Sequence, residues 1–428
     1  MNYNDNHSDF QNFINNIHSL FSRIDNPIIS ASDQKVLQQI GILIEDFLIS
    51  SKEHTPDSEA LLKGLQLLFC SAEHRESKIT KQTNITPPFD ILTSSGNKIT
   101  LGTCIGTGGE GSVYVLPSLP GTVAKIFHNH INLKGKKARL EALIKYQNAS
   151  KINNLLVAAI PEELLYHDNG DCIGYLMPQI SSNLKIFHVL REDSVRKYFP
   201  DLTYKGLIII AYNLAELVAH LHTNGIVIGD MNPNNISIYP DGTICFIDCD
   251  SFDFTDPETK KHFRCTVGLP EFLAPELQKS QTLANGSFTK ESDNFSLAIH
   301  IFRLLMNSAD PFIAQITQEI SLSYQLLDTN YTISHGESPY FRELSNKEIP
   351  VWVPSIEILS DEIQELFRRS FCYDIFTIEE NIKNRPTPKE WMEALLRFYQ
   401  MPFKQCSSNP RHYYLTKFTT CPLCHKKL

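Results

Sequence analysis

The chain contains a glycine-rich segment followed by a lysine, a combination of residue types that suits phosphate binding. Three glycines fit the pattern G-x-G-x-x-G, and a valine follows two residues after the last: Gly106, Gly108, Gly111 and Val113. Glycines at this spacing let a backbone hairpin lie close to phosphates with its N–H groups directed at them. Lys125 ends the short apolar segment 123–125. A lysine there needs an anionic partner, because burying an unpaired ammonium is costly, and phosphates would supply one.

A second group of polar residues follows in the C-terminal half of the chain. Asp230 and Asn235 are five residues apart, and Asp248 ends the apolar segment 244–248, 18 residues after Asp230. Short motifs then follow in order: Ala274-Pro275-Glu276, Asp293 within 292–297, Asp310-Pro311-Phe312 and Arg385 within 384–387. Each of these motifs is weak by itself, but their joint occurrence in this order is specific.

Residues from about 99 to 398 resemble a eukaryotic-type protein kinase domain in these motifs and their order. The resemblance implies that Asp293 is a buried aspartate of the large lobe and that Arg385 pairs with Glu276. Several segments are closer still to a bacterial kinase group related to YegI, whose members often carry a short Cys-rich tail: 108–111, 227–230, 247–252 and 268–272.

The resemblance implies transfer of the γ-phosphate of ATP, in which the protein positions ATP and neutralises charge. Gly106, Gly108, Gly111 and Val113 then belong to the phosphate-covering loop. Lys125 would contact phosphates, and Asp230 would accept the hydroxyl proton. Asn235 and Asp248 would hold Mg²⁺ or Mn²⁺. Glu141, 16 residues after Lys125, is the candidate helix glutamate that pairs with this lysine; the alternative is a solvent-exposed helix residue. Adenine would lie near the gatekeeper and hinge residues Met177, Gln179 and Ile180.

The sequence departs from the family pattern beside these residues. Gly229 replaces the arginine that usually precedes the base, so we expect no control by a phosphate on the activation loop. Asn232 and Leu269 replace the lysine and threonine that serine/threonine kinases use near the γ-phosphate. Asp250 replaces a glycine and adds a second carboxylate, which would bind metal or only increase the negative charge.

These departures leave several functions open. We expect an active protein kinase that phosphorylates a protein substrate, with Ser or Thr as the acceptor that the resemblance implies. The alternatives are a nucleotide-binding pseudokinase, an interaction scaffold that acts through N-terminal helices, and another transfer reaction on a kinase fold. The presence of Asp230 favours catalysis, because a scaffold needs no base.

The C-terminal tail predicts a structural zinc site. Its ligands are spaced C-x5-H-x8-C-x2-C, with these members: Cys406, His412, Cys421 and Cys424. Two thiolates three residues apart can bind one tetrahedral Zn²⁺, and metal binding would then stabilise a tail too short to fold alone. His425 is an alternative fourth ligand, and free thiols at a frayed end are the alternative to a metal site.

The hydrophobic pattern along the chain predicts an α+β fold with appended modules. Apolar residues recur at three- and four-residue spacing near the N-terminus, as in helices, and strand-like segments precede helical ones later. The expected division is a helical module at 1–72, a linker at 73–88, a two-lobed kinase-like domain at 89–398 (small lobe 89–180, large lobe 181–398) and a zinc-binding tail at 399–428. The helical module is the expected docking site for a partner.

The composition limits the remaining functional classes. The chain has 428 residues, 42% of them apolar, and a formal net charge of −9. This composition excludes a wholly disordered chain, and the negative charge argues against nucleic-acid binding. The longest apolar run, 206–211, is too short to span a membrane. Ten scattered cysteines and an N-terminus without signal-peptide features predict a cytoplasmic protein or, alternatively, a bacterial effector exported into a host cell.

Overall fold

The computed structural model describes residues 91–128, 131, 133–278, 287–316, 329–344, 347–350 and 352–424. The predicted helical module at 1–72 and the linker at 73–88 lie outside these residues. The chain divides into two compact units, one of residues 1–87 with 107–109 and one of residues 88–106 with 110–428. The elements described below belong to the second unit, except that Thr107, the last residue of β3, is assigned to the first.

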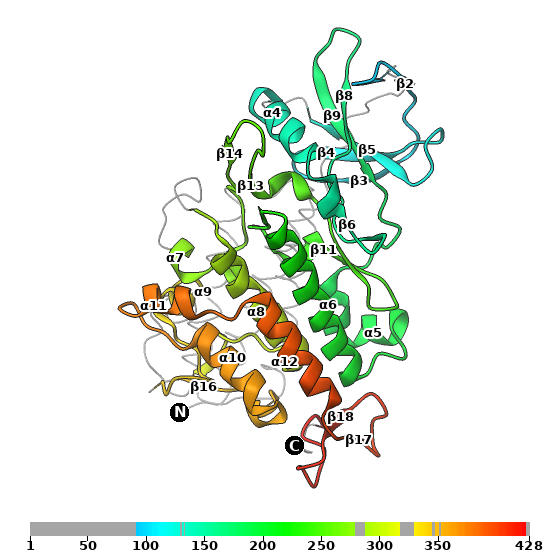
Figure 1. The fold of residues 1–428 in the computed structure, drawn as a ribbon. Helices are drawn as coiled ribbons and strands as arrows, with labels where there is room; N and C mark the ends of the chain where they lie inside the picture. Colours follow the sequence, from blue (N-terminus) through cyan, green and yellow to red (C-terminus); the bar gives the residue numbers. More distant parts are fainter. Residues whose placement is uncertain are drawn as a thin grey trace, which may run out of the picture. The chain divides into compact units, whose positions relative to one another are not determined.

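The N-terminal part of this unit is a seven-stranded sheet in the order β2-β1-β8-β9-β5-β4-β3 (Figure 1). Its strands are β1 (Ile91–Thr93), β2 (Lys98–Ile99), β3 (Cys104–Thr107), β4 (Gly111–Val115), β5 (Thr122–Phe127), β8 (Glu163–Tyr166) and β9 (Cys172–Pro178). The strands from β2 to β4 in this order pair antiparallel. The β1–β2 hairpin pairs Ile91 with Ile99 around a turn in which Gly96 has φ +82°.

Strand β5 separates two clusters of apolar side chains because its residues alternate between the faces of the sheet. Ala124 packs on one face with a cluster that includes Ile91 and Leu176. Phe127 packs on the other face with Tyr175 and with Leu140 of helix α4 (Leu133–Ile144). Lys125 directly follows Ala124, so its side chain points to the opposite face of the sheet, which α4 covers. Two short strands, β6 (Lys151–Ile152) and β7 (Leu155–Leu156), follow α4.

The following part of the unit is mainly helical. Its helices are α5 (Glu192–Tyr198), α6 (Tyr204–Thr223), α7 (Pro275–Gln278), α8 (Lys290–Leu305), α9 (Thr329–His335), α10 (Asp361–Phe371), α11 (Ile378–Asn384) and α12 (Pro388–Gln400). Helix α6 packs against both α8 and α12 (Figure 1). Thr203 caps its N-terminus by accepting from the N–H of Gly206, and Gly225 at φ +79° follows its end. The strand-rich and helix-rich parts thus follow each other as predicted.

Helix α6 also meets a simple test for a membrane span. Among the described residues it is long and apolar enough to cross a bilayer by length and composition, but half of its most apolar window is buried inside the protein. Its buried residues include Leu214, Val218 and Leu221, so within this unit it has the character of a core helix.

Short strands connect the helices and form the C-terminal tail. They are β10 (Ile226–Val227), β11 (Ile236–Ile238), β12 (Ile244–Phe246), β13 (Asp253–Thr255), β14 (His262–Phe263), β15 (Gln315–Ile316), β16 (Lys347–Glu348), β17 (Phe403–Gln405) and β18 (Tyr413–Leu415). The β17–β18 hairpin of the tail packs on the helical part: Leu415 is buried in its core, and Phe403 lies against Phe398 of α12.

Candidate active site

Lys125 of β5 is buried and paired with two carboxylates. Its Nζ atom contacts Asp248 and lies 2.8 Å from Oδ1 of Asp250. Burial alone would lower the pKa of Lys125, but Tyr175, Asp250 and Asp248 together raise it well above its ordinary value. The lysine is therefore a fixed positive charge on this face of the sheet, as a phosphate-binding group must be.

The two carboxylates differ in their surroundings. The side chain of Asp248 is 51% exposed, whereas that of Asp250 is 5% exposed. Tyr175 donates a hydrogen bond of 3.0 Å to Oδ1 of Asp250, and Nζ of Lys136 lies 3.9 Å from Oδ2. Burial alone would raise the pKa of Asp250, but the ammonium of Lys125 outweighs burial and holds this pKa below its ordinary value. Asp250 is thus an ionised, buried partner of the lysine.

The structure does not pair Glu141 with Lys125. Glu141 lies on α4, as expected, but its side chain is 52% exposed and Oε1 lies 3.8 Å from Nζ of Lys137, one turn away on the same helix. The solvent-exposed reading of Glu141 therefore describes this structure. Position 141 lies on the exposed side of α4. Lys125 is paired with Asp248 and Asp250 instead.

Helix α4 instead contacts the segment after Asp248 through an arginine. Arg139 Nε donates to the carbonyl of Asp250 at 2.5 Å and Nη1 to the carbonyl of Arg264 at 2.9 Å, while Nη2 donates to the carbonyl of Phe252. The guanidinium thus holds three backbone carbonyls, and it fastens α4 to the segment that carries both carboxylates.

Asp230 has one carboxylate oxygen engaged and one without a partner. Oδ2 accepts hydrogen bonds from the side-chain amides of Asn232 at 2.8 Å and Asn235 at 3.0 Å. Oδ1 is buried and has no hydrogen-bond partner within the described part of the chain. Burial raises the pKa of Asp230, and the amides of Asn232 and Asn235 act in the opposite direction. A buried acceptor without a partner is costly, so Oδ1 suits the hydroxyl group of a substrate.

Asp293 of α8 binds the backbone directly before Asp230. Its carboxylate accepts from the N–H of Ile228 at 2.7 Å and of Gly229 at 2.9 Å, and Oδ2 also lies 2.9 Å from Nε2 of His222. Gly229 has φ +74°, and a Cβ atom there would lie 2.6 Å from Sγ of Cys265. Only glycine therefore fits at this position, where the family usually has an arginine.

Asp248 and Asn235 present oxygen atoms of the kind that Mg²⁺ binds. Asp248 follows β12 in the left-handed conformation at φ +60°, and the N–H of Ile247 donates to the carbonyl of Asn235 at 2.9 Å. That hydrogen bond connects the two segments. The amide nitrogen of Asn235 is used by Asp230, which leaves its side-chain oxygen for a cation. These residues therefore fit the metal that the resemblance implies.

The predicted glycine loop spans the end of β3 and the start of β4. Gly111 begins β4, where a Cβ atom would lie 2.5 Å from the carbonyl oxygen of Ile126, so packing against β5 requires this glycine. Nothing lies within 4 Å of a Cβ atom at Gly106, and Gly108 is exposed in the connection. Val113 lies opposite Lys125 in the β4–β5 register. Gly106, unlike Gly111, therefore has space around its Cα atom, and Gly108 is exposed.

The predicted hinge residues follow one another at the end of β9. Met177 pairs with Val123 of β5 and is half-buried. The N–H of Gln179 donates to the carbonyl of Gly121 at 2.8 Å, so this donor is already used within the protein. Adenine binding near Ile180 and the carbonyl of Gln179 stays a prediction.

An ion pair joins two of the motifs near the C-terminal end of the kinase-like domain. Arg385 is buried, and its two terminal nitrogens each lie 2.7 Å from a carboxylate oxygen of Glu276. Its Nε donates to Oδ1 of Asn381 at 3.0 Å. This bidentate pair connects α7 with the end of α11, as the resemblance implies.

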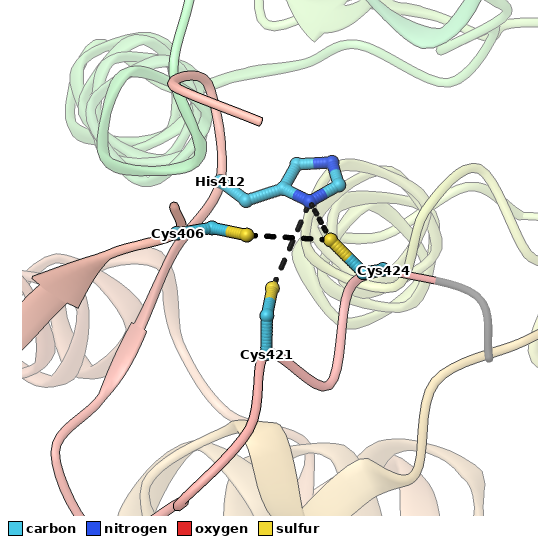
Figure 2. Close-up of side chains that lie close together, drawn as sticks. All are labelled: Cys406, His412, Cys421 and Cys424. Carbon is cyan, nitrogen blue, oxygen red and sulfur yellow. Dashed lines mark hydrogen bonds between the residues drawn. The ribbon is translucent and has the colours of Figure 1, made fainter. Parts of the chain in front are cut away.

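The tail gathers its four predicted metal ligands around one point (Figure 2). All four ligand atoms lie within 4.8 Å of one another. Sγ of Cys406 lies 3.3 Å from Sγ of Cys424, and Nδ1 of His412 lies 3.4 Å from Cys424 and 3.7 Å from Cys421. Tetrahedral zinc with bonds of about 2.3 Å to sulfur separates its ligands by about 3.8 Å. A hydrogen bond from the N–H of Ser408 lowers the pKa of Cys406 to about 7, whereas burial raises the pKa of the neighbouring Cys424. His425 lies outside the described residues.

Sequence reasoning missed three contacts around Lys125: those of Asp250, Tyr175 and Arg139. A second carboxylate two residues after Asp248 was the available signal for Asp250. No local pattern shows that a tyrosine of β9 and an arginine of α4 converge on Asp250, because these contacts join residues 75 and 111 positions apart in the sequence.

Comparisons with known proteins identify the family of the chain. The family model for the protein kinase domain matches residues 102–395. The chain is 30% identical over 338 residues to "Protein kinase YegI" of Escherichia coli strain K12, covering 78% of this chain and 50% of that protein. It is 34% identical over 140 residues to "Serine/threonine-protein kinase SCH9" of Saccharomyces cerevisiae, covering 32% of this chain and 15% of that protein. The chain spans about half the length of the YegI proteins that it matches. With the motifs of the site, the match over most of the chain shows that it belongs to the protein kinase domain family.

Proposed function

We propose that this protein is an ATP-dependent protein kinase that transfers the γ-phosphate to a hydroxyl group of a protein substrate, Ser or Thr. The observation that carries the proposal is the carboxylate of Asp230, whose Oδ2 is fixed by two amides while Oδ1 is buried with no partner among the described residues. A substrate hydroxyl would donate its hydrogen bond to this atom.

The other residues divide the remaining work. Lys125 supplies a fixed positive charge for phosphates, and Asp248 and Asn235 supply the oxygen atoms that would hold Mg²⁺. Bound Mg²⁺ would neutralise charge on the phosphates. Asp230 Oδ1 would orient the acceptor hydroxyl and accept its proton.

Asn232, which stands where the family has a lysine, still supports Asp230. The Asn232 amide donates to Oδ2 at 2.8 Å, and its oxygen accepts from the N–H of Asn234 at 2.8 Å. Asn232 therefore positions the base instead of contacting the γ-phosphate. Ser or Thr as the acceptor is supported by relatives that bear the name serine/threonine-protein kinase.

A nucleotide-binding pseudokinase is the second candidate. It is favoured by one observation, the replacement of both the lysine and the threonine of the γ-phosphate contact by Asn232 and Leu269. Loss of such charge could cost several kcal/mol of transition-state stabilisation.

We also propose that the tail holds structural Zn²⁺ through Cys406, His412, Cys421 and Cys424. Four protein ligands leave no open position for catalysis. The metal would fix the two tail segments after β17 and after β18 to each other.

Transfer of labelled γ-phosphate tests the proposed activity. The purified protein is incubated with ATP and Mg²⁺ or Mn²⁺, alone and with a generic protein substrate, beside Asp230→Ala and Asp248→Ala. Labelling of Ser or Thr that both variants lose supports the kinase. An ATP-dependent rise in melting temperature without labelling in the wild type supports the pseudokinase instead.

A further inference from the structure

We propose that Asp250 is the positioning residue that holds Lys125, in place of a glutamate from helix α4. This inference deepens the proposed function, since it concerns the lysine of the same site. It rests on the contacts around one carboxylate, and it separates the tasks of the two aspartates in the Asp248-Cys249-Asp250 segment.

The first argument is the set of groups that surround the Asp250 carboxylate. Oδ1 lies 2.8 Å from Nζ of Lys125 and accepts a hydrogen bond of 3.0 Å from Tyr175, while Nζ of Lys136 lies 3.9 Å from Oδ2. Lys136 also contacts Glu110, so the ammonium of Lys125 is the main cation at this carboxylate. An ammonium so close disfavours a divalent metal ion there. Asp250 is therefore a partner for the lysine and not a third metal ligand.

The second argument is the contrast with Asp248. Asp248 also contacts Lys125, but its side chain is 51% exposed against 5% for Asp250. A buried carboxylate with a hydrogen bond from Tyr175 stays in place when ligands bind. Asp248 can then turn to a metal while Asp250 keeps the ammonium of Lys125 directed toward the phosphates.

The third argument is the character of α4. This helix presents two cations, Lys136 and Arg139, to the Asp250 segment, and its Glu141 pairs with Lys137. Arg139 holds the backbone carbonyl of Asp250 itself. The carboxylate that fixes the lysine thus belongs to the same short segment as the metal ligand Asp248, and α4 supports that segment from outside.

The test measures MgATP affinity by calorimetry, and ATP KM and kcat by transfer, for Asp250→Asn, Asp250→Glu, Tyr175→Phe and Glu141→Gln. Asp250→Asn keeps the shape of the side chain and removes its charge. We expect it to weaken MgATP binding and to raise KM by about tenfold or more, the size expected when a charged hydrogen bond is lost. Asp250→Glu should recover part of this loss, and Glu141→Gln should bind MgATP like the wild type.

Comparison of kcat with KM and the dissociation constant of MgATP distinguishes a positioning role of Asp250 from a folding defect. A merely structural defect lowers the active fraction and therefore kcat, and it leaves KM and the dissociation constant unchanged. Wild-type affinity in folded Asp250→Asn, or an equal loss in Glu141→Gln, would overturn the inference. If Asp250→Asn does not fold, Tyr175→Phe decides: a weaker MgATP complex supports the inference, and an unchanged one overturns it.

The same experiment distinguishes failure of the proposed function. A wild-type protein that binds MgATP but transfers no phosphate would contradict the kinase, while the order of affinities among the variants would still decide the role of Asp250.

Discussion

The carboxylate of Asp293 accepts a hydrogen bond of 2.9 Å from the backbone N–H of Gly229, the residue directly before Asp230. Its other oxygen accepts from the N–H of Ile228 at 2.7 Å. Asp293 is buried on α8, the helix that also carries His300, whose Nε2 lies 2.7 Å from the carbonyl of Met231. The loop around Asp230 is therefore fixed on both sides by one helix of the core.

Replacing Asp293 by asparagine should weaken this support. One buried backbone N–H would then face an amide nitrogen, and we expect the free energy of unfolding to fall by about 1.5–3 kcal/mol. A displaced Asp230 should also lower kcat by about tenfold. Denaturant unfolding and steady-state kinetics measure the two effects. Asp241→Asn is the matched control, because Asp241 accepts from the N–H of Thr243 at 2.9 Å in an exposed turn; equal effects of the two variants would contradict the assignment.

The buried ion pair of Arg385 should contribute far more to stability than an exposed pair of the same types. Glu276→Gln removes the charge that compensates a guanidinium buried in the core, and we expect a loss of about 3 kcal/mol in the free energy of unfolding. Glu362→Gln is the matched control, because Glu362 forms a bidentate pair with the exposed Arg397. That variant should lose less than about 1 kcal/mol. Denaturant midpoints that shift equally in both variants would count against this account.

Zinc removal should destabilise the tail. Cys421→Ser removes one of four ligands, so purified protein should contain less than one zinc per chain by elemental analysis and should melt at a lower temperature. The loss arises because the bound metal would hold the segments after β17 and after β18 together, so that its binding free energy adds to the stability of the tail. Cys372→Ser, at an exposed cysteine away from the cluster, should leave zinc content and melting temperature unchanged. Wild-type protein without bound zinc after purification in zinc-containing buffer would refute the site.

The raised pKa of Asp230 predicts the acidic side of the pH–rate profile. The protonated carboxyl cannot accept the proton of a hydroxyl, so kcat/KM should fall as pH decreases through the pKa of Asp230. Burial raises this pKa above the ordinary value of 3.8, and the fall should therefore begin at a higher pH than for an exposed aspartate. Circular dichroism at each pH separates this titration from acid unfolding. A rate that stays constant down to pH 3.8 in folded protein would be inconsistent with Asp230 as the base.

Much of the fold could be predicted from local patterns. The spacing of apolar residues predicts a strand-rich part, which contains the hairpin at Ile91–Ile99, before a helix-rich part, which contains α6. The order of the motifs was sufficient to predict that Asp230, Asn235 and Asp248 belong to one site, because the resemblance to the family implies where the neighbouring strands and helices lie.

The partner of Lys125 could not be predicted in the same way. Periodicity places Glu141 and Arg139 on one helix, but it does not show which of them faces the sheet. That choice depends on how α4 packs against Phe127 and Tyr175, residues distant in sequence. The identity of the carboxylate that pairs with a buried lysine is therefore a property of tertiary packing.

The most direct test of the account compares turnover and nucleotide binding in Asp230→Asn. This variant keeps the shape of the side chain, and it lacks the charge on which proton transfer depends. The account predicts that kcat for transfer to a protein hydroxyl falls by about 100- to 10,000-fold, while the dissociation constant of MgATP, held by Lys125, Asp248 and Asn235, stays close to that of the wild type. Retained transfer by folded Asp230→Asn would contradict the central claim that Asp230 is the base of a protein kinase.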